Sequence, residues 1–167
     1  MPALQLLRPD HEERVLAFER ANRSYFATFI TDRGDDFFNS FPARHAAELA
    51  EQAAGAAAYY VLVAVDGAVV GRFNLRFVGA GVAVLGYRVA ADAAGQGLAG
   101  AAVRDICRLA VADHGVHTIR ASTSHENIAS TRVLAKAGFV AVRPAEPHEI
   151  GGKAGMTYHR IVADAHA

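Results

Sequence analysis

Hydrophobic and polar positions alternate in several short runs of this chain and repeat every three to four residues in others. Alternating runs rich in Val, Leu and aromatic residues predict strands, and the longer period predicts helices. The predicted strands cover residues 4–9, 59–65, 68–78, 82–90, 117–124, 139–143 and 156–162. The predicted helices cover residues 9–22, 43–54, 98–113 and 127–138.

Turn signals set the order of these elements. Asp66-Gly67 is a strong hairpin turn, so the strands from residue 59 to residue 90 form an antiparallel meander. The helix over 98–113 then leads to another strand, which is the strand–helix–strand crossover of a mixed α/β sheet. Gly138 predicts the end of the last helix. Residues 144–155 predict a long, mobile loop rich in Gly and Pro.

The helix over 98–113 is amphipathic, with Arg104 and Arg108 off its apolar face. Cys107 lies on this helix without a neighbouring base, which favours a packed thiol over a reactive one. The apolar face consists of Leu98, Ala102, Ile106 and Leu109.

Six aromatic residues fall between residues 25 and 41. They either pack in the core or form an aromatic wall of a substrate groove, for which Tyr25, Phe29 and Phe38 are the candidates. Asp32, Asp35 and Asp36 lie in the same segment. They are typical of a solvated loop, and the alternative is that they attract a cationic substrate.

The composition predicts one folded domain over residues 1–167, with 52% hydrophobic and 20% charged residues. The charges of the 17 basic and 17 acidic side chains cancel, so the formal net charge is zero. A nucleic-acid partner is therefore disfavoured, because phosphate binding needs clustered cations. The longest uncharged run is too short to span a bilayer, and the first residues lack a secretion pattern. With the single Cys107, these features predict a cytoplasmic protein with no membrane partner.

Histidines can bind metal ions, but those of this chain are scattered along the sequence. Only His114 and His117 are close in sequence, and no HExxH or CxxC motif accompanies them. We therefore expect no metal site and interpret the eight histidines as ordinary surface residues.

The stretch AAGQGLAG, residues 93–100, carries three glycines at the spacing of a dinucleotide-binding turn. A Rossmann fold would place this turn after a first parallel strand, with an acidic residue about 20 positions further on. Here a meander precedes the turn, and Glu126 is 31 residues beyond Gly95. A nicotinamide cofactor is therefore disfavoured. The turn still leads a strand into a helix N-terminus, which favours a phosphate-bearing ligand over a purely structural turn.

Two stretches resemble the GNAT superfamily of acyl-CoA-dependent N-acetyltransferases, in particular its branch of RimL/RimJ-type ribosomal-protein N-terminal acetyltransferases. LGYRVAADAAGQGLAGAAVRDI is similar to the superfamily's CoA-pyrophosphate motif, and ASTSHENIASTRVLAKAGF to the branch's E-N-x-A-S motif. The resemblance implies a GNAT-like acyl-CoA N-acyltransferase fold over nearly the whole chain. It also implies acetyl-CoA as cofactor and an amine as acceptor, and it leaves a homodimer open.

The resemblance assigns roles to residues of this chain. Asn127 would hold the pantetheine arm or a water, and Ser130 would deliver a proton to sulfur or solvate it. Their alternative roles are local, as a helix cap and in backbone hydrogen bonding. The backbone N–H groups near Val89 would polarise the thioester carbonyl. The pyrophosphate would be held by backbone donors of Gly95, Gln96, Gly97, Leu98 and Ala99.

The sequence departs from the family at three positions. Ala94 stands where the pyrophosphate motif has Arg or Gln, Val84 where many relatives have Glu, and Leu134 where many have a tyrosine acid. Tyr87 is a further phenol near the cleft, interpreted as core. Glu126 and His125 are candidate bases, and a solvated surface pair is the alternative.

A weak base suits an amine that is already partly neutral. An α-amine, with a pKa of about 7.8, is neutral a few hundred times more often at pH 7 than a lysine near 10.4. We therefore expect transfer of an acetyl group to a protein or peptide N-terminus by direct attack in a ternary complex. The alternatives are a small-molecule amine such as a polyamine, antibiotic or amino-acid derivative, and a non-catalytic acyl-CoA-binding module.

Overall fold

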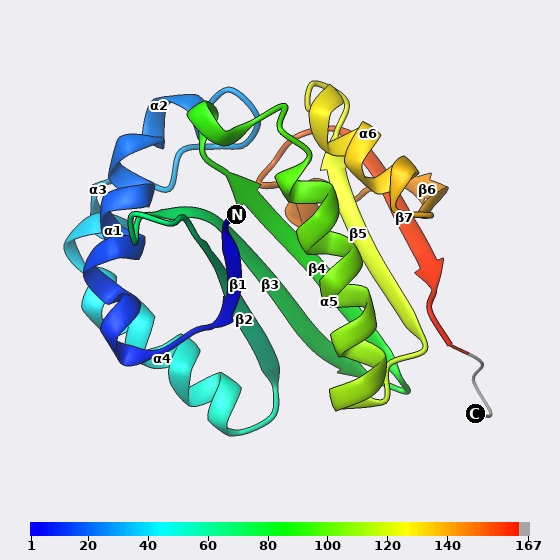
Figure 1. The fold of residues 1–167 in the computed structure, drawn as a ribbon. Helices are drawn as coiled ribbons and strands as arrows, with labels where there is room; N and C mark the ends of the chain where they lie inside the picture. The colour runs from blue at the N-terminus through cyan, green and yellow to red at the C-terminus, as the bar shows by residue number, and fades with distance from the viewer. Residues whose placement is uncertain (164–167) are drawn as a thin grey trace.

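A seven-stranded sheet runs through the molecule in the order β1-β2-β3-β4-β5-β7-β6 (Figure 1). The computed structural model describes residues 1–163. All neighbouring strands are antiparallel except β4 and β5, so the predicted meander and crossover in a mixed α/β sheet are confirmed. The strands are β1 (Ala3–Leu6), β2 (Ala57–Val63), β3 (Val69–Gly79), β4 (Val82–Val89), β5 (Thr118–Ser124), β6 (Val140–Pro144) and β7 (Gly155–Ile161).

Helices cover the sheet on both faces. In Figure 1, α5 and α6 cross β4 and β5, whereas α1 to α4 gather beside β1 to β3. The α-helices are α1 (Glu12–Ala21), α2 (Arg23–Phe26), α3 (Asp35–Asn39), α4 (Phe41–Ala53), α5 (Leu98–His114) and α6 (Ile128–Lys136). Three 3₁₀ turns are η1 (Pro9–His11), η2 (Ala91–Ala93) and η3 (Pro147–Ile150).

Strand β2 is buried along its whole length because it serves two cores. Tyr60 packs with the cluster under α5 and α6, and Tyr59 and Val61 pack with the cluster under α1, α3 and α4. This explains its nearly continuous apolar sequence, since a strand covered on both faces has no polar side. Cys107 is 2% exposed in the first cluster, and burial raises the pKa of its thiol, which confirms the packed-thiol prediction.

The aromatic segment belongs largely to the second core. Phe26, Phe37, Phe38 and Phe41 are all buried there, which supports the core interpretation for these four. The sequence pattern missed the two short helices in this segment, α2 and α3. Each has only four or five residues, too few for a helical period to show.

The region predicted as irregular between residues 144 and 155 contains η3. Pro147 begins this turn, and the Glu146 N–H donates to the Glu149 carboxylate at 2.9 Å. Ile150 is buried at its end. Capping by Glu149 and burial of Ile150 therefore fix part of the predicted loop.

The surface prediction is wrong for two histidines. His11 is 0% and His45 is 2% exposed. His11 Nδ1 accepts the Arg8 N–H at 2.9 Å, and His45 Nε2 donates to the Arg8 carbonyl at 3.0 Å. Both rings thus form hydrogen bonds with the backbone of Arg8, just after the end of β1. Sequence spacing does not show these contacts. His166 lies outside the described residues.

A buried ion cluster joins the helices to the sheet. The Arg72 guanidinium on β3 donates to Glu19 of α1 at 2.8 Å and to Glu48 of α4 at 3.0 Å. Arg88 on β4 donates to the other Glu19 oxygen at 3.1 Å. Glu19 is 1% exposed, so its charge depends on these two partners.

We expect Glu19→Gln to destabilise the protein by about 3 kcal/mol, because it leaves two buried guanidinium groups under-compensated. Chemical denaturation measures this loss. Asp105→Asn, which breaks an exposed ion pair with Arg108, is the matched control and should cost about 0.5 kcal/mol or less. Equal losses in the two variants would contradict a structural role for the cluster.

Candidate active site

The parallel strands β4 and β5 separate at one end of the sheet. They pair from Val82 with Thr118 to Leu85 with Ala121, and both continue for three or four residues without pairing to each other. The gap holds a cavity of about 80 Å³. Its lining comes from residues 85–87 and 121–124, from α6 with its N-terminal cap, and from Ile30 and Ile150.

This cavity reaches both faces of the sheet. Leu85 and Tyr87 belong to the core under α5 and α6, whereas Ile30 comes from the loop after α2 and Ile150 from η3. Gly86 lies between them on β4, is exposed, and has no heavy atom within 4 Å of where a Cβ would stand. A glycine in a strand with open space above it allows close approach of a ligand. The gap can therefore receive two groups from opposite sides.

Hydroxyl groups dominate the polar chemistry of the cavity. Tyr87 Oη lies 2.9 Å from Ser130 Oγ. Burial raises the pKa of Tyr87 to about 12, although its hydrogen bond with Ser130 acts in the opposite direction. The Ser124 side chain is buried, and its Oγ has no hydrogen-bond partner within the described residues. Such an orphaned hydroxyl fits a ligand that supplies the missing partner.

Asn127 caps α6. Its Oδ1 accepts the Ser130 N–H at 3.1 Å, so the local capping role is present. Both side chains also line the cavity, as the resemblance implies. Leu134 lines it one turn further on, which places an apolar group at the position where the resemblance implies a tyrosine in many relatives.

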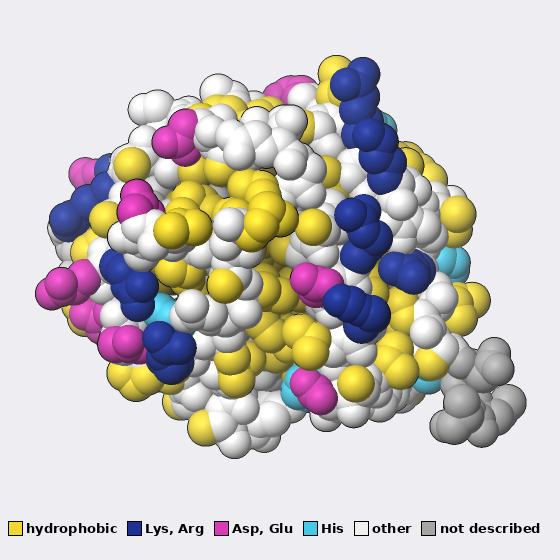
Figure 2. Space-filling view, in the orientation of Figure 1, with side chains coloured by type: hydrophobic (Ala, Val, Ile, Leu, Met, Phe, Trp, Pro, Cys, Tyr) yellow, Lys and Arg dark blue, Asp and Glu magenta, His cyan; other side chains and the backbone are white. Residues whose placement is uncertain are grey.

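The loop before α5 presents free backbone donors. Gly95 and Gly97 have φ angles of 77° and 75°, and neither would bring a Cβ within 4 Å of another atom. In the described structure, the N–H groups of residues 95–99 donate no hydrogen bond to the chain. Open N–H groups at a helix start bind phosphate. In Figure 2, basic side chains run over α5 and α6, adding positive charge on this side of the molecule.

The residues present therefore fit coenzyme A. The loop of residues 95–99 would offer its donors to the pyrophosphate. The gap between β4 and β5, with Asn127 and the Ser124 Oγ that lacks a partner among the described residues, would offer partners to the pantetheine arm. When bound, acetyl-CoA would supply the acyl thioester, and backbone and side-chain groups of this chain would bind and orient it.

One carboxylate near the cavity was not predicted from the sequence. Glu149 Oε2 accepts the Ser122 hydroxyl at 3.3 Å, and Ser122 lines the cavity. Arg143 pairs with Glu149 at 2.9 Å and lowers its pKa to about 2. The sequence signal for Glu149 was a capping box that it forms with Glu146 around Pro147. A capping box predicts where a helical turn begins, but it does not show that the turn lies beside the cavity.

The other predicted residues lie at different distances from the cavity. Glu126 and His125 are exposed and absent from its lining, and Val89 is half-buried at the end of β4. Tyr25 and Phe29 are half-buried with their rings in edge contact. Sequence adjacency to Asn127 thus did not bring Glu126 into the cavity, because the chain turns outward before α6.

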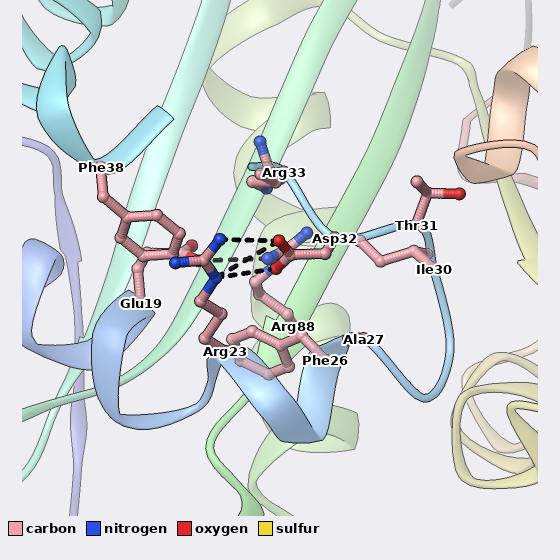
Figure 3. Close-up of a pocket in the computed structure, with 10 residues that line it drawn as sticks. All are labelled: Glu19, Arg23, Phe26, Ala27, Ile30, Thr31, Asp32, Arg33, Phe38 and Arg88. Carbon is pink, nitrogen blue, oxygen red and sulfur yellow. Dashed lines mark hydrogen bonds and ion pairs between the residues drawn. The ribbon is translucent and has the colours of Figure 1, made fainter. Parts of the chain in front are cut away.

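Phe38 lines a second, smaller cavity beside Arg88 and Arg23 (Figure 3). Arg23 pairs there with Asp32 at 2.8 Å and with Asp35 at 3.0 Å. This pairing lowers the pKa of Asp32. One guanidinium contacts two of the three aspartates, and all three carboxylates are exposed, as expected of a solvated loop.

Comparison with known proteins agrees with this geometry. The acetyltransferase (GNAT) domain family model matches residues 3–140. The comparison with curated protein sequences gave no match. A crossover sheet with open N–H groups before α5 and a split between its parallel strands fits an acyl-CoA-dependent transferase. The chain belongs to the GNAT acetyltransferase family, and it is an acetyl-CoA-dependent N-acetyltransferase.

Solved structures share the fold at low identity. Ribosomal-protein-S5-alanine acetyltransferase from Vibrio fischeri has a TM-score of 0.88 at 20% identity, covering 96% of this chain and 93% of that one. RimJ from Mycobacterium smegmatis, in complex with CoA-disulfide, has a TM-score of 0.83 at 24% identity, covering 95% of this chain and 80% of that one. Spermidine N-acetyltransferase from Vibrio cholerae, in complex with CoA and spermine, has a TM-score of 0.78 at 14% identity, covering 99% of this chain and 98% of that one. No helix in residues 1–163 is long and apolar enough to cross a membrane.

We expect Gly97→Ala to weaken CoA binding about tenfold, equivalent to about 1.4 kcal/mol, by adding a Cβ to the open loop. Isothermal titration with CoA measures the effect. Gly55→Ala is the matched control, because Gly55 has a φ of 78° and equally open surroundings in the turn after α4. Both variants should lose about 1 kcal/mol of stability from backbone strain. An equal loss of CoA affinity in both would contradict the assignment of the loop.

Proposed function

We propose that this enzyme acetylates the N-terminal α-amine of a protein or peptide by direct attack in a ternary complex. The observation that carries the proposal is the lining of the cavity between β4 and β5. Among the described residues, no carboxylate and no histidine lines it. An acceptor must then arrive at the thioester as a neutral amine.

The ionisation of amines separates the candidate acceptors. About one α-amine in ten is neutral at pH 7, against fewer than one lysine side chain in a thousand. Glu149 is ionised but held by Arg143, and a carboxylate with a pKa of about 2 is a weak base. An α-amine therefore needs the least help from the protein.

A polyamine acceptor is less well supported. A spermidine acetyltransferase shares this fold, and a polycation requires several uncompensated carboxylates for binding. Here three of the carboxylates near the two cavities already contact an arginine, Asp32 and Asp35 sharing Arg23 and Glu149 pairing with Arg143. Peptide backbone and a single amine make no such demand.

Residue roles follow the same proposal. The backbone of residues 95–99 holds the pyrophosphate, Asn127 holds the pantetheine arm, and the backbone near Val89 orients the thioester carbonyl. Ser130 Oγ faces the sulfur that leaves. Glu126 stays a prediction for the base, acting from outside the cavity through water, and Tyr25, Phe29 and Phe38 stay predictions for the acceptor wall.

A panel of acceptors tests the function. It contains a lysine-free peptide with a free N-terminus, an N-terminally blocked peptide with one lysine, and spermidine, each followed by release of free thiol from acetyl-CoA. We expect the first peptide to be preferred at pH 7 by a few hundredfold. Faster turnover of spermidine would instead identify a polyamine acetyltransferase.

The pH dependence gives an independent check. Among the described residues that line the cavity, only Tyr87 has an ionisable side chain. We therefore expect kcat/KM to rise about tenfold per pH unit and level off near pH 8, following the acceptor α-amine. A rise that continues toward pH 10 would indicate a lysine-type amine. Stabilisation by CoA, about 2.7 kcal/mol at 100 times its Kd, without turnover of any amine would indicate an acyl-CoA-binding module.

A further inference from the structure

The hydrogen bond between Tyr87 and Ser130 joins two elements across the cavity. Tyr87 lies on β4 and Ser130 in the first turn of α6, 43 residues apart. Their side-chain oxygens are 2.9 Å apart, and Tyr87 Oη is also 3.4 Å from the Ser130 carbonyl oxygen. A phenol is a stronger acid than an aliphatic hydroxyl, and the 3.4 Å contact is long for a hydroxyl hydrogen bond, so we assign the single phenol proton to the 2.9 Å contact with Ser130 Oγ.

The direction of this bond decides what the serine can do. The neighbouring Thr131 hydroxyl donates back to the Asn127 carbonyl at 3.2 Å, as helical hydroxyls commonly do. Ser130 makes no such bond in the described structure. With Tyr87 donating to it, Ser130 Oγ–H has no acceptor among the described residues and is free to donate to a ligand in the cavity that Ser130 lines.

We propose that Tyr87 is a positioning residue, which fixes the Ser130 hydroxyl so that it donates a hydrogen bond to the sulfur leaving the thioester. Leu134 stands where the resemblance implies a tyrosine acid in many relatives. In this chain the hydroxyls of Tyr87 and Ser130 together take the role of that tyrosine. Since the phenol stays protonated well above pH 10, its donation to Ser130 is constant over the working range.

The bonds and protons balance without a strong acid. The amine nitrogen forms a bond to the acyl carbon, and the acyl carbon–sulfur bond breaks with its electron pair on sulfur. Ser130 Oγ–H stabilises that charge by hydrogen bonding, and solvent then supplies the proton of the thiol. The surplus proton of the nitrogen leaves to solvent. Hydrogen bonds in a chain polarise one another, so donation by Tyr87 strengthens donation by Ser130.

The test measures the thiol pKa of CoA in the binary complex, from thiolate absorbance against pH, with no acceptor present. A hydrogen bond to a charged group is worth about 1.5 kcal/mol or more, so Tyr87→Phe and Ser130→Ala should each raise this pKa by about one pH unit. The affinity for CoA at pH 7 should stay within about twofold. Tyr87→Phe keeps the stacking of ring 87 on Phe73, centroids 5.6 Å apart, so the fold is retained.

Turnover supplies the second readout. We expect kcat to fall about tenfold in each single variant and no further in the double variant, because both remove one unit. Tyr60→Phe is the control, since it deletes another buried phenol oxygen of the same core away from the cavity. Additive effects on kcat, or an unchanged thiol pKa in Tyr87→Phe, would overturn the proposal.

The inference rests on the acetyltransferase activity and not on the α-amine acceptor. Failure of the acceptor panel alone would leave the thiol measurement intact, because that measurement needs only CoA. Conversely, an unchanged thiol pKa with preserved peptide turnover would remove Tyr87 from the mechanism and leave the acceptor assignment standing.

Discussion

The parallel pairing of β4 and β5, and its end after Leu85 and Ala121, is the constraint on which the site depends. Two parallel strands need a crossover, and α5 supplies it, starting with the donor-rich loop beside the gap. Where the pairing stops, the sheet opens, and β4 and β5 both contribute side chains to one cavity. A continuous ladder would leave no passage from one face of the sheet to the other.

Holding the sheet open needs support from elsewhere in the molecule. Arg72 and Arg88 extend from β3 and β4 to Glu19 on α1, so the strand that carries the gap is tied to the helices by buried charge. On the far side, Thr31 donates to the Gly151 carbonyl and joins the loops that contribute Ile30 and Ile150. The cavity is thus bounded by elements that are 120 residues apart in sequence.

Uncharged polar groups carry the chemistry of the site. Its lining has hydroxyls, one amide and backbone groups, with the carboxylate of Glu149 held outside by Arg143. Such a lining favours an acceptor that is neutral on arrival, and it stabilises developing negative charge by fixed donors rather than by proton transfer. Acceptor class and leaving-group stabilisation are therefore two consequences of one arrangement.

The sequence by itself determined the order of the strands and the longer helices, the crossover and the glycine loop, because these depend on local periodicity and on backbone preferences at Gly95 and Gly97. It also placed Asn127 and Ser130 on one end of a helix. Only the tertiary structure decided that Tyr87 meets Ser130, that Glu149 lies behind Ser122, and that Glu126 stays outside. Those contacts depend on how far β4 and β5 diverge and on how two distant loops fold back, and neither leaves a local pattern in the chain.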